Sequence, residues 1–416
     1  MDGKKYIEGL CRDAKAASRV IARYPTERKN GILLAIAAAL RERKDYIIAE
    51  NAIDIEAADR DGMAAAMRDR LLLNGERIDG MALSVEEIAA LPDPVGRIER
   101  MTVRPSGIRV GQMRVPLGVV AVIYEARPNV TTDIAALCLK SGNAAVLRGG
   151  KEAIRTNIAL HAVVREVLTS SGCPEAAVTF VDRTGRELVP LLLKMNDYID
   201  IVIPRGGEQL IRAVTEESTI PVIKHDKGVC HIFVDETAEE EMANRIAVNA
   251  KVQRPSVCNA METLLIHAGY PFKESLVGSL LDRKVEIRGC PRTVSLFNGK
   301  VQKATDDDWG KEFLDLVLAV KVVGSLDEAM EHIARYGSGH SEAIVTSNYF
   351  NAERFMSEVD SSAVFVNAST RFHDGGEFGL GAEVGISTQK LHARGAMGVE
   401  GLTILKYVVY GKGEVR

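Results

Sequence analysis

The chain has 416 residues, 46% of them hydrophobic and 26% charged, and its formal net charge is -4. This composition excludes disordered, fibrous and very small folds, and the length predicts two or three domains. With 53 basic against 57 acidic residues, the charge is too balanced for a protein that grips nucleic acid by neutralising its phosphates.

The N-terminal part of the chain is predicted to be helical from Lys4 to about Leu91. Alanine, leucine, arginine and glutamate dominate there, and no proline occurs between Pro25 and Pro92. Residues 1–19 lack the apolar core of a secretory signal. The longest apolar run falls well short of the roughly 20 residues of a membrane span. These features predict a cytoplasmic protein that does not enter a membrane.

A β-hairpin is predicted next, with strands at 97–104 and 108–115 around the turn sequence Pro-Ser-Gly at 105–107. A last strand-like segment at 403–410 has no helix after it and is a candidate partner for this hairpin. From these residues alone, the hairpin either folds back on its own chain or reaches a neighbouring subunit.

From Gly118 onward, apolar runs alternate with amphipathic stretches, which predicts βαβ units around parallel sheets. A helix is predicted at 131–141, with Thr131 as its cap and Gly142 at its end. The first sheet is predicted to contain strands at 119–124, 144–147, 178–181, 199–203 and 221–223. A second α/β domain is predicted to contain strands at 231–234, 263–266, 316–323, 343–346 and 363–367.

Two glycine pairs after predicted strands are candidate phosphate sites. No G-x-G-x-x-G follows the first strand of the first sheet, so the usual dinucleotide fingerprint is absent. Arg-Gly-Gly-Lys at 148–151 and Pro-Arg-Gly-Gly-Glu at 204–208 instead place bare backbone at helix starts, where amides and the helix dipole favour phosphate. Each alone also fits an ordinary turn, and their pairing on one sheet favours the phosphate site.

The cysteines form neither a C-x-x-C pair nor a close cluster with histidine, which argues against a zinc ribbon or a disulfide framework. Cys258 stands apart because it lies in a polar, proline-containing loop just before a strand, next to Arg254. Such surroundings favour the nucleophilic thiolate, and a packed, unreactive thiol is the alternative. Cys11 and Cys138 lie on helical stretches and are predicted to be buried and inert.

Segments 115–120 and 141–148 and the Cys258 loop, in this order and separation, resemble the aldehyde dehydrogenase superfamily. Segments 124–129 and 323–344 resemble most closely those members that reduce an acyl phosphate of glutamate in proline biosynthesis. The resemblance covers nearly the whole chain and implies an α/β fold of three parts. These are a Rossmann-like cofactor domain (1–96 and 116–228), a second α/β domain for catalysis (229–402) and a β arm for oligomerisation (97–115 and 403–416).

The resemblance also implies roles for single residues. Cys258 matches the nucleophile, Asn129 matches the amide that stabilises the oxyanion, and Glu312 matches the glutamate that holds the nicotinamide ribose. The implied reaction is NADPH-dependent reduction of L-gamma-glutamyl 5-phosphate to L-glutamate 5-semialdehyde through a Cys258 thioester. A homo-oligomer and a contact with glutamate 5-kinase are implied as well. The candidate cofactor-binding residues are Arg148, Lys151, Pro204, Gly206, Gly207 and Glu312.

Two departures from the wider superfamily carry information. Where many aldehyde oxidisers have Glu-Leu-Gly-Gly, this chain has Lys-His-Asp-Lys-Gly at 224–228, so the base that activates water is not provided. This favours exchange of the acyl group with phosphate. Where many relatives have Lys-Pro-Ser-Glu, Lys151 replaces the carboxylate and favours the 2'-phosphate of NADP.

Substrate recognition is predicted to use Arg127, Arg254 and Arg371, because guanidinium forks suit the carboxylate and phosphate of the substrate. Thr370, next to Arg371, is a further candidate. A structural ion pair is the alternative for each arginine. His332 and His340 lack a matching carboxylate cluster, which argues against a metal site.

Segment 378–381 resembles the glycine-rich loop that closes the substrate pocket in the superfamily, and whether segment 375–381 moves is left open by the sequence. The alternative function is a phosphate-independent aldehyde dehydrogenase that oxidises another small semialdehyde.

Overall fold

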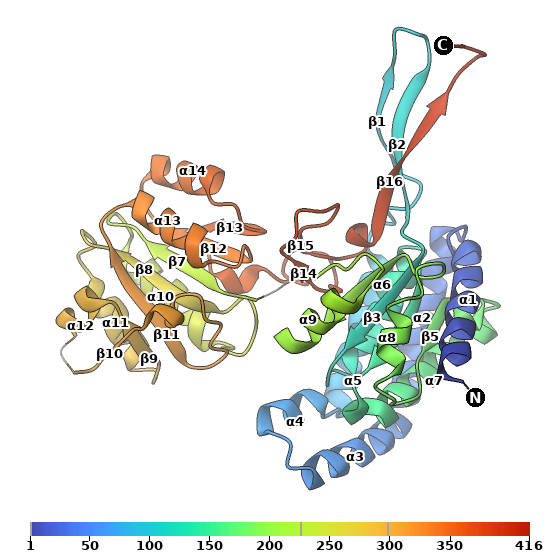
Figure 1. Cartoon of the computed structure of the whole chain (residues 1–416), viewed down its shortest axis with the longest axis horizontal. Coiled ribbons are helices and arrows are strands. Elements are labelled where there is room, and N and C mark those ends of the chain that lie inside the picture. The colour runs from blue at the N-terminus through green and yellow to red at the C-terminus, as the bar shows by residue number, and fades with distance from the viewer. Residues whose placement is uncertain (1, 225–226, 298) are drawn as a thin grey trace. The chain divides into compact units, whose positions relative to one another are not determined.

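The computed structural model describes residues 2–224, 227–297 and 299–416, which form two compact units (Figure 1). The first unit contains the chain up to Lys224 together with 379–385 and 397–416, and the second contains the rest. Segments 379–385 and 397–402 therefore group with the first unit, although they lie inside the range 229–402 predicted for the catalytic domain.

The N-terminal region is helical, as predicted. Asp2 caps the first helix by accepting from the Lys4 amide at 3.1 Å, and Asn74 caps the fifth by accepting from the Arg77 amide at 2.8 Å. The first helix packs on the sheet of the first unit, and the second and fifth pack against each other. The helices are α1 (Gly3–Ile21), α2 (Thr26–Glu42), α3 (Lys44–Arg60), α4 (Ala65–Leu71) and α5 (Gly75–Ala90).

The sheet of the first unit is parallel and has the strand order β5-β4-β3-β6. Its strands are β3 (Val119–Tyr124), β4 (Ala144–Gly149), β5 (Val178–Phe180) and β6 (Ile201–Arg205). The predicted fifth strand at 221–223 is reduced to a single bridge between Val202 and Val222. Pro221 has no amide hydrogen to donate, which limits the pairing of this segment.

The helices that connect these strands include α6 (Asn129–Lys140), α7 (Ile154–Ser170), α8 (Leu188–Leu192) and α9 (Glu208–Glu217). The prediction that Thr131 caps α6 was wrong. The helix begins two residues earlier, and the Thr131 hydroxyl is buried and donates to Asn157 Oδ1 at 3.0 Å. Gly142 follows the helix with a φ of 75°, a left-handed conformation that glycine adopts readily.

A separate antiparallel sheet forms the arm that projects from the first unit in Figure 1. It contains β1 (Ile98–Val103), β2 (Arg109–Pro116) and β16 (Thr403–Tyr410), in the order β1-β2-β16. β16 pairs with β2 from Thr403 opposite Pro116 to Tyr410 opposite Arg109. The predicted hairpin and its pairing with the last strand are thus confirmed.

The second unit is built on a parallel sheet of seven strands in the order β10-β9-β11-β8-β7-β12-β13. Five of them lie where the sequence predicts strands: β7 (Cys230–Val234), β8 (Met261–His267), β11 (Val317–Val323), β12 (Ser341–Val345) and β13 (Ala363–Val366). The sequence prediction missed β9 (Glu286–Gly289) and β10 (Gln302–Lys303), which are short and polar. A small pair, β14 (Ile386–Ser387) and β15 (Gly395–Ala396), completes the strands.

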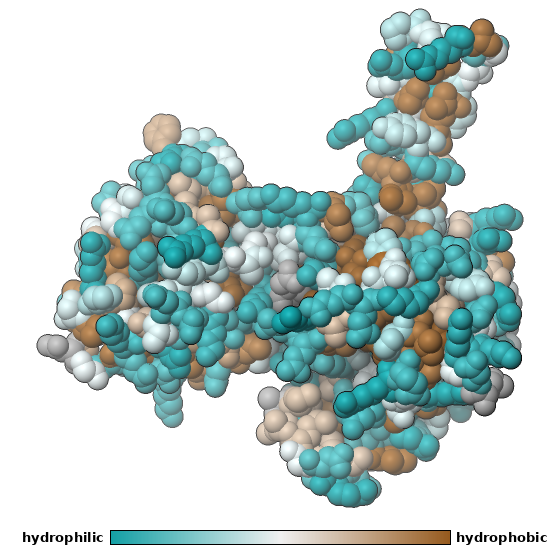
Figure 2. Space-filling view, viewed as in Figure 1, coloured by the Kyte–Doolittle hydropathy of each residue, from teal (hydrophilic) through white to brown (hydrophobic). Residues whose placement is uncertain are grey.

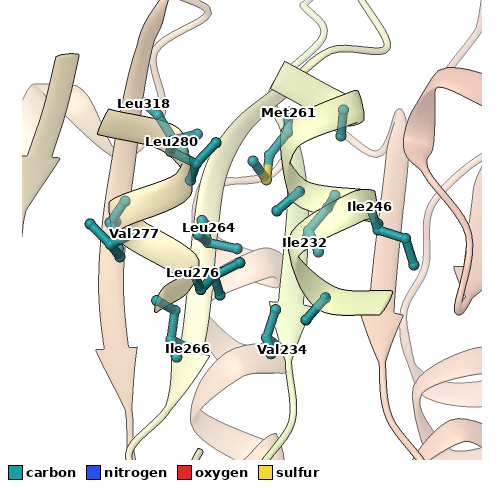
Figure 3. Close-up of a cluster of buried hydrophobic side chains, with 14 of the residues drawn as sticks. Ile232, Val234, Ile246, Met261, Leu264, Ile266, Leu276, Val277, Leu280 and Leu318 are labelled. Atoms are coloured by element: carbon teal, nitrogen blue, oxygen red, sulfur yellow. The ribbon is translucent and has the colours of Figure 1, made fainter. Parts of the chain in front are cut away.

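The larger of two hydrophobic clusters in the second unit lies between this sheet and two helices (Figure 3). Leu276, Val277 and Leu280 of α11 (Lys273–Leu281) pack with Leu264 of β8 and with Ile246 of α10 (Glu240–Val252). The other helices of the unit are α12 (Pro291–Leu296), α13 (Leu326–Tyr336) and α14 (Tyr349–Glu358). Within the described residues, no helix is both long and apolar enough to cross a membrane.

Candidate active site

Cys258 lies in the segment that joins α10 to β8, and its side chain is partly accessible. The other five cysteines are buried. Burial raises the pKa of Cys11 and that of Cys138 to about 12, so both remain thiols at neutral pH. The prediction that these two are buried is confirmed, and Cys258 is the one cysteine that is not buried.

Gly228 lies directly against the backbone of Cys258. A Cβ atom added to Gly228 would lie 2.6 Å from the Cys258 Cα and would overlap the Cys258 carbonyl. The thiol of Cys230, two residues further on, donates to the same carbonyl oxygen at 3.1 Å. The chain entering β7 therefore fixes the backbone that carries the candidate nucleophile.

Glu312 is held at the same place in the second unit. Its Oε1 atom accepts the amide hydrogen of Gly228 at 3.0 Å. Since Gly228 in turn touches Cys258, the structure brings the predicted ribose-binding carboxylate and the predicted nucleophile together. Two residues after Glu312, Leu314 has a φ of 57°, which is unusual for a residue other than glycine.

Asn259, next to Cys258, is buried and joins the Cys258 loop to the segment 370–373 by hydrogen bonds. Its amide donates to the His373 carbonyl at 2.9 Å, and its own carbonyl accepts the hydroxyl of Thr370 at 2.8 Å. The Arg371 guanidinium donates to the Asn259 side chain and, at 3.1 Å, to Gln253 Oε1. Thr370 and Arg371 thus lie at the Cys258 loop and bind protein groups there, whereas Arg254 is exposed.

Asn129 is exposed at the first position of α6, in the first unit. Its side-chain amide donates to Asp133 Oδ2 at 2.9 Å, and the other oxygen of Asp133 accepts from Ser84 at 3.2 Å. Burial raises the pKa of Asp133 to about 6. Arg127, another predicted residue, is half-buried two positions before this helix.

The first predicted phosphate site lies at the end of β4. Gly150 precedes a short 3-10 turn at Lys151–Ala153 that leads into α7. Lys151 is the first residue of this turn, and its side chain is exposed, which a residue that binds the phosphate of a ligand requires. Arg148 is buried and donates to the Gly149 carbonyl, while its Nε atom has no acceptor among the described residues. Glu152 accepts the Ala126 amide at 2.8 Å.

The second predicted phosphate site lies at the end of β6, after Pro204. Gly207 is the N-cap of α9, and its amide donates to Glu125 Oε2 at 2.8 Å. A Cβ atom on Gly206 would lie 2.6 Å from the Glu125 carboxyl carbon. The Glu125 carboxylate thus already binds the amide at this helix start, and a phosphate could use that amide only after Glu125 has moved away. Sequence reasoning missed Glu125, although it directly follows β3 at the carboxyl edge of the sheet.

Sequence reasoning also missed Lys251 and Glu262, which form a buried ion pair at the two ends of the Cys258 loop. Their only signal was a lysine in the mostly apolar last part of α10 and a glutamate at the start of the mostly apolar β8. Of the predicted sequence 224–228, His225 and Asp226 lie outside the described residues.

Within the described ranges, no three His, Cys, Asp or Glu side chains form a group suited to a metal ion. His332 and His340 therefore belong to no such group.

Comparison with known proteins identifies the family to which the chain is related. The model of the aldehyde dehydrogenase family matches residues 2–288. The gamma-glutamyl phosphate reductase of Moorella thermoacetica is 54% identical over 405 residues, 97% of each chain. The crystal structure of the enzyme of that name from Thermotoga maritima covers 99% of each chain with a TM-score of 0.96 and 45% identity. An acetylating aldehyde dehydrogenase from Geobacillus thermoglucosidasius, 17% identical with a TM-score of 0.73, shows the shared fold.

Proposed function

The chain belongs to the aldehyde dehydrogenase family, and within it to the gamma-glutamyl phosphate reductases, and from this membership we propose its reaction. The protein reduces L-gamma-glutamyl 5-phosphate to L-glutamate 5-semialdehyde and phosphate, with NADPH as the reductant, in proline biosynthesis. The observation that carries this proposal is the placement of Cys258, partly accessible and fixed against Gly228, beside the Glu312 carboxylate.

The reaction begins at the Cys258 sulfur. The thiolate attacks the acyl carbon, a C–S bond forms, and the C–O bond to phosphate breaks, which leaves a thioester on Cys258. The Asn129 amide and the Cys258 backbone amide stabilise the negative charge on the carbonyl oxygen. NADPH, when bound, supplies the hydride that reduces the thioester. The C–S bond then breaks, the semialdehyde leaves, and Cys258 is regenerated.

The candidate cofactor residues suit this nucleotide. Glu312 holds the nicotinamide ribose through its carboxylate. The start of α9, with Pro204, Gly206 and Gly207 before it, is our candidate for a phosphate of the nucleotide, and binding there requires that Glu125 release the Gly207 amide. Arg148 and Lys151 supply positive charge for the 2'-phosphate of NADP, for which Lys151 is exposed.

The substrate has a carboxylate, an amino group and a phosphate to be recognised. Arg254 is exposed four residues before Cys258 and is our first candidate for an oxyanion of the substrate. Arg127 is the candidate from the first unit. Arg371 and Thr370 both contact Asn259. We therefore propose that their main role is to support the Cys258 loop, and we rank them behind Arg254 and Arg127 as substrate-binding residues.

The arm is our candidate for the contact between copies of the chain. Hydrophobic and hydrophilic residues alternate along the arm in Figure 2, and Val103, Tyr407 and Val409 are more than half exposed. Segments 97–116 and 403–416 hold eight basic and two acidic residues, although the whole chain is acidic by four charges. The rest of the chain therefore has a formal net charge of about -10, so an arm that packs on a second copy outside that copy's own arm meets a body of opposite net charge. The contact with glutamate 5-kinase and the cytoplasmic location stay predictions.

Phosphate dependence tests the proposed function. The purified protein is given L-glutamate 5-semialdehyde and NADP, and NADPH formation is followed with and without phosphate or arsenate. We expect turnover only when one of these anions is present, because the thioester then has an acceptor. Equal turnover in their absence would instead support the phosphate-independent aldehyde dehydrogenase. Cys258→Ala should abolish turnover and leave NADPH binding nearly intact.

A further inference from the structure

A buried ion pair closes the two ends of the loop that carries Cys258. Lys251 lies in the last turn of α10 and Glu262 is the second residue of β8, and their Nζ and Oε2 atoms are 2.6 Å apart. Both side chains are fully buried. Because this contact spans the loop, the separation of its two ends depends on the length and charge of these side chains.

The second oxygen of Glu262 points to a different segment. Its Oε1 atom accepts the amide hydrogen of Leu314 at 3.2 Å. Leu314 has the left-handed φ of 57°, a conformation that costs energy in a leucine and persists when its surroundings impose it. The Glu262 carboxylate is one of the groups that hold Leu314 in this conformation. Leu314 itself lies two residues along the chain from Glu312.

These contacts close a ring of residues around the candidate site. Glu312 accepts the Gly228 amide, Gly228 lies against Cys258, the Cys258 loop ends at Glu262, and Glu262 holds Leu314 next to Glu312. Every link lies within the second unit. Gly228 makes its two contacts through its backbone, whereas Glu262 uses its side chain to connect the end of the Cys258 loop with the segment that carries Glu312.

Stability alone does not explain why a charged pair occupies this position. An apolar pair of similar volume commonly stabilises a protein as well as a buried ion pair does, because both charges lose their hydration on burial. What the carboxylate adds is two oxygens in fixed directions, one toward each segment. Burial raises the pKa of Glu262 to about 7 and lowers the pKa of Lys251, while the contact between the two groups acts on both pKa values in the opposite direction.

We infer that Glu262 is a positioning residue, which keeps the Glu312 segment in register with the Cys258 loop so that bound NADPH meets the nucleophile. This inference rests on the proposed function, which assigns ribose binding to Glu312 and nucleophilic attack to Cys258. It adds a role for a residue that is fully buried and touches neither reactant.

A matched pair of double variants separates positioning from mere stability. Lys251→Met with Glu262→Gln removes both charges and keeps an oxygen for the Leu314 amide. Lys251→Met with Glu262→Leu removes that oxygen too, at similar side-chain size. We expect the leucine variant to be at least as resistant to urea as the glutamine variant, because it buries no unpaired amide.

The dissociation constant of NADPH, measured by fluorescence quenching on the full chain, is the deciding value. We expect it to stay within about threefold of wild type in the glutamine variant and to rise about tenfold in the leucine variant, about 1.4 kcal/mol at 25 °C. The less stable variant would then bind the cofactor more tightly, which a purely structural role of Glu262 does not produce. Equal dissociation constants in the two variants would overturn the inference.

Glu262→Asp serves if a double variant fails to fold, because it keeps the charge and only shortens the side chain. An NADPH dissociation constant raised about fivefold or more would support the inference, and an unchanged one would overturn it. Wild-type protein that binds no NADPH would overturn the proposed function together with this inference. Normal wild-type binding with equal variants would overturn the role of Glu262 alone.

Discussion

The side-chain amide of Asn129 and the carboxylate of Asp133 are joined by a hydrogen bond of 2.9 Å, one turn apart at the start of α6. Ser84 of α5 donates to the other oxygen of Asp133, so the carboxylate is held from a second helix. An amide that is already oriented loses less freedom when it stabilises an oxyanion. Asp133 therefore prepares Asn129 for the role that we propose for it.

Asn129→Ala is expected to lower kcat by about 10²-fold to 10³-fold, since this is the usual cost of one missing oxyanion donor. The alanine variant should bind NADPH as wild type does, because Asn129 has no proposed contact with the nucleotide. Steady-state reduction of gamma-glutamyl phosphate gives kcat, and fluorescence quenching gives the NADPH affinity. A loss of less than about threefold would remove the oxyanion role from Asn129.

Asp133 gives the protein a pH dependence with a defined sign. Burial raises its pKa to about 6, above the roughly 3.9 of an unfolded aspartate. The folded state then holds this proton more tightly, so the contribution of Asp133 to stability falls as the pH rises from about 4 to about 6 and is level above that. In Asp133→Asn this titration is absent.

The urea midpoint of Asp133→Asn relative to wild type should therefore rise between about pH 4 and pH 6 and stay constant above about pH 7. Urea unfolding at several pH values across this range measures it. Asp133→Ala serves as the control for lost packing, because it removes the same titration without keeping the amide. A difference that is constant over the whole range would contradict the raised pKa.

Gly228→Ala tests the contact that fixes the nucleophile. The added methyl group would overlap the Cys258 carbonyl, so the loop has to move. A displacement of about 1 Å costs on the order of 10²-fold in rate, and we expect a loss of that size in kcat together with altered iodoacetamide labelling of Cys258. Gly278→Ala in α11 is the matched control, since a Cβ there meets no atom within 4 Å. Equal activity of both variants would argue against the contact.

The sequence alone predicted the parts of this fold that depend on local pattern. Apolar runs revealed β3, β4, β7 and β8, and proline with glycine revealed the hairpin of the arm. β9 and β10 were missed because short polar strands have no apolar run, and their place at the sheet edge depends on pairing with β11.

The candidate site shows the same division. Cys258 was found because its loop is unusual in composition. The contacts that hold it, from Gly228, Glu262 and Asn259 to distant segments, join residues up to 114 positions apart. Glu125 at the start of α9 was missed for the same reason, since 82 positions separate it from Gly207. No local pattern in a single sequence records such pairings.

Lys151→Glu tests the preference for NADPH. Lys151 is exposed at the start of its 3-10 turn, so the substitution should not disturb the fold. A carboxylate there repels the 2'-phosphate of NADPH, and we expect affinity for NADPH to fall about tenfold or more while affinity for NADH falls less than about twofold. Titration of both nucleotides measures this. Parallel losses for the two nucleotides would place Lys151 away from the 2'-phosphate.

The arm is tested by adding negative charge where a partner should pack. Tyr407→Asp with Val409→Asp alters two exposed side chains of β16. If the arm joins copies of the chain through apolar contacts and positive charge, the double variant should sediment as a smaller species than wild type at the same concentration. Leu83→Asp, on the exposed side of α5 and off the arm, is the control and should keep the wild-type sedimentation coefficient. Unchanged sedimentation of the double variant would show that the assembly does not need this strand, and the positive charge of the arm would then require another partner.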